Sequence, residues 1–428
     1  MNREILRIAL PAIVANITIP LLGLVDTAIA GHLAGATLIG AMAVASMVFN
    51  LIYWNFGFLR MGTSGLTAQA YGAGNHTAAA TLLAQTSALA ALIGIGIMAL
   101  QVPLLWVTMR VIGASTEVES LASAYYRIVI WGAVPTLVMM SIKGWLLGMQ
   151  DSRGAMEVSI VVNVLNIVAS LVAAYPLGLG FEGIAYGTLA AQWLGLVYAA
   201  AIVLLRFRRI VRITPWRKAL RFKGAGQLFR LNGNIFARST LLMIVNLAVV
   251  AIGARSGDLI LAVNALIQHL NTLYAYFLDG IAFAGEALVG KYVGRGNTER
   301  LRLCVRRLFL WGVILAVGFT LLYTFPQLIF SLLTDDPTVR AAAMDYRLWC
   351  ALLPAAGLAA FVWDGVFIGL AYGRGMLIAV TAACALFFAL YAILPPSMGN
   401  HRLWLAFVIY LAARGIVQTW LYRRKQLC

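Results

Sequence analysis

A single carboxylate, Asp26, lies in an apolar stretch of the sequence that begins near Ile8. If this stretch crosses a membrane as a helix, a charge near its centre costs roughly 2.5 to 3.5 kcal/mol, and such residues usually face a cavity or pair with one another. Loss of contact with water favours the neutral form of a carboxylate. A buried Asp26 is therefore a candidate site for the uptake and release of a proton.

The neighbours of Asp26 leave two interpretations open. Gly23 and Ala30 lie at i−3 and i+4 on the same helical face, and their small side chains would leave room for water, a cation or a partner helix. Pro20 removes a backbone donor and is a candidate helix-bend residue. In the second interpretation, Asp26 lies about one turn from the outer end of the span and is simply hydrated.

A second group of charged residues lies in the C-terminal half of the chain. Asp279 and Glu286 are seven residues apart, so they share one face of a helix, and Arg238 is a candidate counter-charge. Asp364 directly precedes a Gly-x3-Gly pattern typical of closely packed membrane helices. This group would serve either as a buried structural pairing or in ion coupling and substrate contact.

Uncharged polar residues also interrupt apolar stretches. Asn163 and Asn166 lie in one such stretch, and Thr188 and Gln192 recur at i, i+4 in the next. All four are candidate polar partners in one cavity. The alternative is that they join helices, since such bonds contribute about 0.6 to 2 kcal/mol each.

The composition indicates the elements that position these residues. Of 428 residues, 62% are hydrophobic and 11% are charged, against roughly 45–50% and about 25% in soluble domains. Apolar runs of about 20 residues, the length that crosses a bilayer, recur along the whole chain. We expect an all-α integral membrane protein with twelve spans, at 5–30, 37–59, 77–102, 120–143, 156–176, 183–205, 228–252, 259–281, 304–330, 342–370, 375–395 and 402–422.

Twelve spans place both termini on one side of the membrane. About 23 Lys and Arg fall in segments on that side and about 6 on the other, which indicates cytoplasmic termini in a bacterial-type inner (plasma) membrane. The largest basic cluster, Arg206 to Lys223, is interpreted as a topology anchor that touches anionic lipid headgroups, so the net charge of +17 does not indicate nucleic acid. The N-terminus has no pattern of a cleavable signal peptide.

Other classes of chemistry have little support in the sequence. The four cysteines and four histidines are scattered without ligand spacing, so we expect no metal site and no disulfide framework. No nucleotide-binding loop, GxSxG or HExxH motif is present. We therefore expect no catalytic residues, no enzymatic activity and no cofactor.

The chain also repeats itself. Residues 31–75 align with 253–297 without a gap and share the ending Gly-x-Gly-Asn, and 143–154 align with 364–375 through Gly-x3-Gly and a closing Arg-Gly. The offset spans six helices, an even number, so the two halves insert in the same orientation. We expect an N-lobe at 1–206 (helices 1 to 6), a basic cytoplasmic linker at 207–226 and a C-lobe at 227–428 (helices 7 to 12). Two such lobes favour transport by alternating access.

Three motifs resemble the multidrug and toxic compound extrusion (MATE) family, in particular its DinF-like branch. They are "LPAIVANITIPLLGLVDTAIAGHLAG", "FLRMGTSGLTAQAYGAGN" and "FLDGIAFAGEALVGKYVGRGN". The resemblance implies that Asp26, in "VDTAIAG", matches the protonation site on helix 1 of this family. It further implies that Asn163, Asn166 and Thr188 match the polar residues that assist it.

The chain departs from relatives at three positions. Ser170 stands where some relatives have a second aspartate, and Leu22 where they have a tyrosine, so Asp26 would act without a second carboxylate in its lobe. Asp364 matches an aspartate used for cation coupling in another branch, but the region of its glutamate partner offers Arg238.

The resemblance implies a secondary antiporter that exports bulky amphipathic, often cationic compounds in exchange for inward H⁺. The alternatives are Na⁺-coupled drug efflux, or a flippase for lipids or lipid-linked sugars with similar architecture. The expected partners are small-molecule substrates, H⁺ and membrane lipids, and we expect a monomer.

Overall fold

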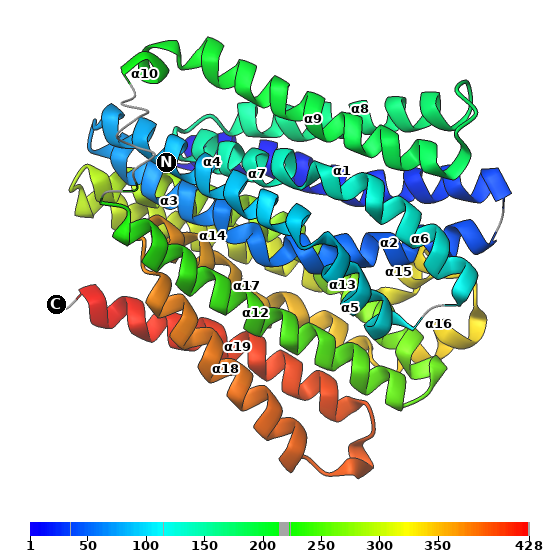
Figure 1. The fold of residues 1–428 in the computed structure, drawn as a ribbon. Helices are drawn as coiled ribbons and strands as arrows, with labels where there is room; N and C mark the ends of the chain where they lie inside the picture. Colours follow the sequence, from blue (N-terminus) through cyan, green and yellow to red (C-terminus); the bar gives the residue numbers. More distant parts are fainter. Residues whose placement is uncertain (35, 114, 214–221, 223, 427–428) are drawn as a thin grey trace. The chain divides into compact units, whose positions relative to one another are not determined.

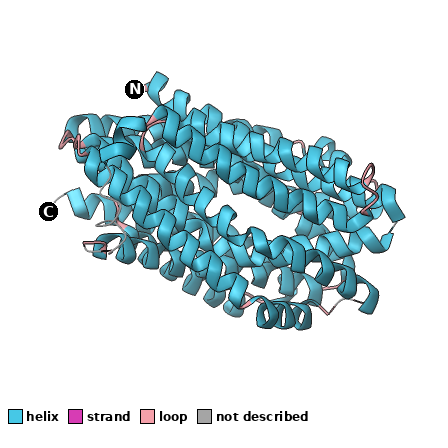
Figure 2. Ribbon diagram, turned by 45° about the horizontal axis from the view of Figure 1, so that its top comes forward, coloured by secondary structure: helices cyan, strands magenta, loops and turns pink. Residues whose placement is uncertain are grey.

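The computed structural model describes residues 1–34, 36–113, 115–213, 222 and 224–426. Within this part of the chain all regular elements are helices (Figures 1 and 2). Twelve helical segments of the described residues are long and apolar enough to cross a membrane. The predicted all-α membrane fold with twelve spans is therefore confirmed.

The helices divide between the two halves of the chain. In the first half they are α1 (Asn2–Ala34), α2 (Ala36–Trp54), α3 (Phe58–Gly72), α4 (His76–Ala99), α5 (Gln101–Ile112), α6 (Thr116–Val129), α7 (Ala133–Gly148), α8 (Ser152–Ala174), α9 (Gly180–Arg206) and α10 (Arg208–Ile213). In the second half they are α12 (Gly226–Arg255), α13 (Asp258–Gly294), α14 (Thr298–Tyr323), α15 (Pro326–Leu333), α16 (Pro337–Met344), α17 (Arg347–Gly369), α18 (Gly373–Ile393) and α19 (His401–Gln426). Short 3-10 turns are Asn55–Gly57, Ile130–Gly132 and Pro396–Met398.

The chain forms two compact units, Val14–Phe229 and Met1–Ile13 with Arg230–Cys428. The start of α1 belongs with the second unit, because Glu4 accepts hydrogen bonds from Tyr292 Oη at 3.2 Å and Lys291 Nζ at 3.5 Å. The expected N-lobe at 1–206 included this start, and the expected linker at 207–226 contains α10. Residues 214–221 and 223 of that linker lie outside the described residues.

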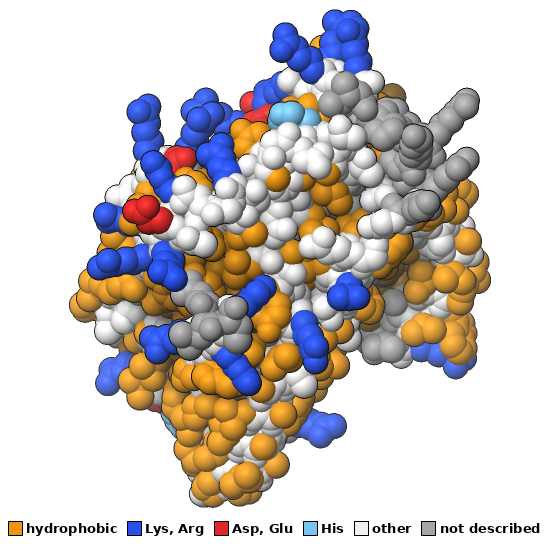
Figure 3. All heavy atoms as spheres, turned by 90° about the vertical axis from the view of Figure 1, so that its left-hand side faces the viewer, with side chains coloured by type: hydrophobic (Ala, Val, Ile, Leu, Met, Phe, Trp, Pro, Cys, Tyr) orange, Lys and Arg blue, Asp and Glu red, His pale blue; other side chains and the backbone are white. Residues whose placement is uncertain are grey.

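Each unit has its own apolar core and a polar end. Trp145 in the first unit and Trp404 in the second are fully buried, and each indole N–H finds an acceptor, Ala79 O at 2.7 Å and Asn264 Oδ1 at 2.9 Å. Figure 3 looks onto the side that lies at the left of Figure 1, and it shows many Lys and Arg side chains on this face among hydrophobic side chains. This distribution is typical of helices whose flanks face lipid.

Three predicted span boundaries were wrong. The spans expected at 37–59 and 259–281 extend to Gly72 and Gly294. The added residues are rich in glycine and alanine, so their hydropathy is lower, yet most of them are buried by neighbouring helices. The span expected at 304–330 ends at Tyr323, because Pro326 cannot continue α14 and begins α15 instead.

The sequence repeat corresponds to a repeated helix contact. A Cβ added at Gly148 of α7 would lie 2.6 Å from Thr67 Cβ of α3, and one at Gly369 of α17 would lie 2.8 Å from Val289 Cβ of α13. Thr67 and Val289 are matched residues in the sequence alignment. The glycines therefore allow the same close approach of two helices in both units.

The shared Gly-x-Gly-Asn ending also has a structural reason. Gly74 and Gly296 adopt left-handed φ angles of 71° and 65°, which glycine reaches without steric cost. The next residue caps the following helix in both units: Asn75 Oδ1 accepts from Ala78 N, and Asn297 Oδ1 accepts from Arg300 N, each at 2.9 Å.

The glycine contacts lead to a stability prediction. In Gly365→Ala the new methyl would collide with the backbone of Ala282, so we expect a loss of about 1 to 3 kcal/mol and a lower melting temperature in detergent. Gly318→Ala on α14 is the control, because nothing lies within 4 Å of its added Cβ. Equal melting temperatures for the two variants would contradict this account of the repeat.

Candidate functional site

Asp26 is buried in the first unit. Its residue is 9% exposed, and its Oδ1 atom has no hydrogen-bond partner among the described residues. It lies within electrostatic range of the Tyr125 hydroxyl on α6. The alternative that Asp26 is simply hydrated at a span end is therefore disfavoured by its burial. A buried acceptor without a donor is costly, so a proton or a cationic donor supplied at Oδ1 would stabilise this site.

Polar residues of α6, α8 and α9 form a connected network in the same unit as Asp26. Tyr125 Oη lies 3.2 Å from Thr188 Oγ1 on α9, and Asn166 Nδ2 on α8 donates to the same oxygen at 3.1 Å. Ser170 Oγ donates to Asn166 Oδ1 at 3.3 Å. The network links α6, α8 and α9, and its Tyr125 hydroxyl lies within electrostatic range of Asp26 on α1.

Two other predicted partners, Asn163 and Gln192, form no hydrogen bond with this network among the described residues. Asn163 Nδ2 donates to Thr18 Oγ1 of α1 at 2.9 Å, two turns before Asp26 on the same helix. Gln192 packs against Gly132, and its Oε1 has no hydrogen-bond partner among the described residues. Pro20 lies within the unbroken helix α1.

Tyr125 and Thr18 were missed in the sequence. Tyr125 is 5% exposed, and its ring packs against Phe181 and Phe49. The adjacent pair Tyr125–Tyr126 in a segment with two acids was the available signal. Spacing could not assign Tyr125 to Asp26, because the two residues lie on helices far apart in the chain.

The network gives a second stability prediction. Thr188→Val removes the acceptor of Asn166 and the contact with Tyr125, so we expect a loss of about 0.6 to 2 kcal/mol and a lower melting temperature. Thr81→Val is the matched control, because the Thr81 hydroxyl donates to Thr77 O within its own helix. An unchanged melting temperature in Thr188→Val would show that the network does not join these helices.

The second unit contains a different cluster, centred on Asp364 of α17. Asp364 Oδ2 accepts from Arg238 Nη2 of α12 and from Arg414 Nη2 of α19, the latter at 2.9 Å, and Oδ1 accepts from Gln418 Nε2 at 2.8 Å. Both arginines are 4% exposed. Each acidic oxygen therefore already has at least one donor, and Oδ2 has two charged ones.

Three further acidic residues, Glu286, Asp279 and Glu157, lie on helices other than those of Asp26 and Asp364. Glu286 is buried on α13 and Asp279 is partly buried on the same helix, within electrostatic range of Tyr276. Arg238, considered as their counter-charge, forms its ion pair with Asp364. Glu157 forms an ion pair with Arg206 at the exposed end of α9. Among the described residues, no group of three His, Cys, Asp or Glu side chains is arranged to hold a metal ion.

The MatE family model matches residues 11–172 and 235–394, one stretch in each half of the chain. The chain belongs to the MatE family. It is 36% identical to DNA damage-inducible protein F of Escherichia coli over 99% of this chain and 92% of that protein. It is 26% identical to the probable multidrug resistance protein NorM of Thermotoga maritima, over 79% of this chain and 74% of that protein.

Solved structures of MATE transporters have the same fold. An outward-facing multidrug resistance MATE transporter superposes with a TM-score of 0.83 over 99% of this chain and 95% of that one, at 20% identity. The resemblance to the MATE family and its DinF-like branch is therefore confirmed. This chain is therefore a membrane protein of the MATE multidrug efflux transporter family.

Proposed function

We propose that this protein is an H⁺-coupled antiporter that exports amphipathic, often cationic compounds, with Asp26 as the coupling residue. The observation that supports this most strongly is the buried Asp26 Oδ1, which has no donor among the described residues. A proton or a cationic substrate would each satisfy that oxygen, and they would compete for it. Ionised Asp26 holds a cation, and protonation removes the charge and weakens that hold.

The second unit supports protons over Na⁺ in this proposal. A Na⁺ site requires several oxygen ligands with net negative charge, and the acid that another branch uses for cation coupling corresponds to Asp364. Here Arg238 and Arg414 both donate to Asp364 Oδ2. Two guanidinium groups at one carboxylate oxygen repel a metal cation, so we assign this cluster a structural role.

A flippase for lipid-linked sugars is less well supported. Such a cavity would need several cationic side chains available to bind a pyrophosphate. The buried arginines of the second unit, Arg238 and Arg414, already bind Asp364. The antiporter therefore remains the function that the site supports best.

The membrane potential suffices to drive the export of a neutral substrate. A membrane potential of 100 mV contributes about 2.3 kcal/mol for each charge moved, and about 1.4 kcal/mol corresponds to a tenfold ratio of concentrations. One proton exchanged for one neutral substrate would sustain a gradient of roughly 40-fold at that potential. For a monovalent cation no net charge moves, so only the pH difference would drive export.

Proteoliposomes test this proposal directly. Vesicles loaded with a fluorescent cationic dye would be given either a pH gradient or a Na⁺ gradient of equal size, with the other ion held constant. We expect the pH gradient to drive dye movement. The Na⁺ gradient should leave dye movement at the level seen in protein-free vesicles. Movement driven by Na⁺ alone would contradict the choice of ion, and flipping of labelled lipid without dye movement would favour the flippase.

A further inference from the structure

A groove lies between α17 and α19, within the second unit and away from the Asp364 cluster. Its volume is about 420 Å³, which falls in the range of roughly 300 to 1,000 Å³ of small-molecule sites. The floor consists of small residues, among them Ala355 and Ala359 of α17 and Ala412 and Gly415 of α19. A Cβ at Gly415 would lie 2.5 Å from Ala359 Cβ, so the two helices meet here and leave the hollow beside their contact.

The sides of the groove are apolar and exposed. Ile416 is 68% exposed and Trp420 is 55% exposed. Both lie on the face of α19 opposite to Arg414 and Gln418, which point toward Asp364. On a membrane-spanning helix, exposed apolar side chains of this kind are in contact with lipid, so the groove opens to hydrocarbon chains.

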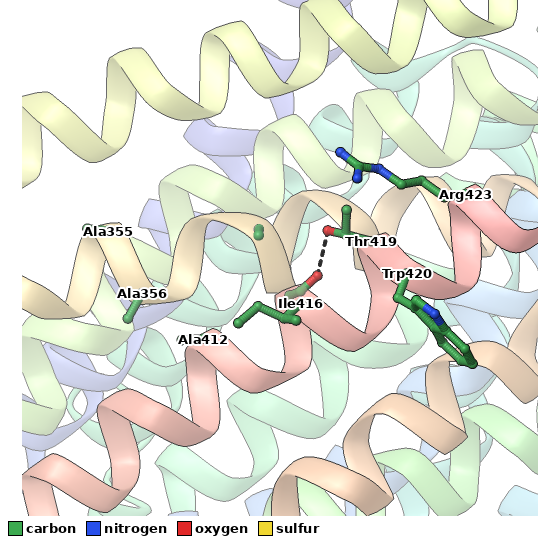
Figure 4. A pocket seen from close by; sticks show the side chains of 9 residues that line it. Ala355, Ala356, Ala412, Ile416, Thr419, Trp420 and Arg423 are labelled. Atoms are coloured by element: carbon green, nitrogen blue, oxygen red, sulfur yellow. Dashed lines mark hydrogen bonds between the residues drawn. The ribbon is translucent and has the colours of Figure 1, made fainter.

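One end of the groove carries a positive charge. Arg423 lies in the last turn of α19, and Figure 4 shows it at the opposite end of the groove from Ala355. Of the residues that line the groove, Arg423 alone is charged, and it is exposed and has no ion pair among the described residues. The hydroxyl of Thr419 is already bonded, to Gly415 O and to Trp363 Nε1. The Arg423 guanidinium is therefore the group in this groove that can bind the polar end of a ligand.

We propose that this groove binds an anionic phospholipid, with one acyl chain along the alanine floor and the phosphate on Arg423. The positive charge of Arg423 complements the negative charge of a phosphate, and this favours an anionic lipid as the occupant. A cationic drug would meet a guanidinium and no acid in this groove, so the site is separate from the substrate cavity of the proposed function. Trp420 would lie where the acyl chain of the lipid meets its head group, because indole side chains prefer the interface between the membrane and water. Arg424, stacked over Trp420 at 5.4 Å, adds positive charge nearby without lining the groove.

Native mass spectrometry of the purified full-length protein tests this site. The probes are phosphatidylglycerol and phosphatidylcholine with identical acyl chains. We expect the wild type to retain one phosphatidylglycerol in preference to phosphatidylcholine. Arg423→Gln should weaken the binding of phosphatidylglycerol about fivefold, which is the affinity that one basic residue near an anionic lipid surface contributes. Arg424→Gln is the matched control and should have a smaller effect, since that residue does not line the groove.

A second variant tests the apolar half of the groove. Ala355 is exposed on α17, so Ala355→Leu fills the groove without disturbing the core, and we expect it to reduce the binding of both lipids. Equal retention of the two lipids by the wild type would overturn the proposal. So would equal losses in Arg423→Gln and Arg424→Gln, which would indicate a diffuse basic surface. A dimer that Ala355→Leu dissociates would overturn it as well, because a second copy would then be the occupant.

Discussion

In Asp26→Asn, dye efflux driven by a pH gradient should fall to the level of protein-free vesicles, a loss of at least tenfold, while the protein remains folded. The asparagine keeps the size of the side chain and removes the group that binds and releases a proton. Folding should be preserved because Asp26 Oδ1 has no hydrogen-bond partner to lose among the described residues. The measurement is dye efflux from proteoliposomes with equal amounts of monodisperse protein.

The control for this prediction is Asp335→Asn. Asp335 is exposed in the turn between α15 and α16, where a neutral amide should leave efflux unchanged. Wild-type efflux by Asp26→Asn would exclude Asp26 as the coupling residue. Tyr125→Phe should reduce efflux only in part, because it removes the hydroxyl that contacts Thr188 and lies within electrostatic range of Asp26 but keeps the ring.

Asp364→Asn should be the most destabilising single change in the second unit. It removes the carboxylate charge with which both Arg238 and Arg414 form ion pairs, and both guanidinium groups are buried. Removing one partner of a buried ion pair lowers the stability of the fold by about 3 to 5 kcal/mol, because an uncompensated charge remains. We expect a large decrease in melting temperature and in the yield of monodisperse protein.

Combined variants separate a structural role from a functional one. Replacing Asp364, Arg238 and Arg414 together by leucine removes all three charges, and such replacements are often neutral or stabilising. We expect this triple variant to regain most of the stability that Asp364→Asn loses. If it also retains pH-driven efflux, the cluster is structural; if it is stable but inactive, Asp364 takes part in coupling and our assignment is wrong.

Much of the architecture could be predicted from the sequence, because a bilayer imposes a length and a composition on every span. The twelve spans, the repeat and the family follow from local patterns such as the Gly-x-Gly-Asn endings at Asn75 and Asn297. The boundaries at Gly72 and Gly294 could not be predicted in this way. The residues before them are buried by protein, and hydropathy measures affinity for lipid.

The sequence by itself determined that Asp26 is a carboxylate in an apolar helix and that Ser170 offers no second one. Only the tertiary structure decided that Asp26 Oδ1 lacks a donor among the described residues, that Tyr125 lies within electrostatic range of Asp26, and that Asp364 is bound by two arginines. The physical reason is that spacing along one helix fixes which residues share a face. Which faces meet depends on how glycines such as Gly148 and Gly369 let neighbouring helices approach.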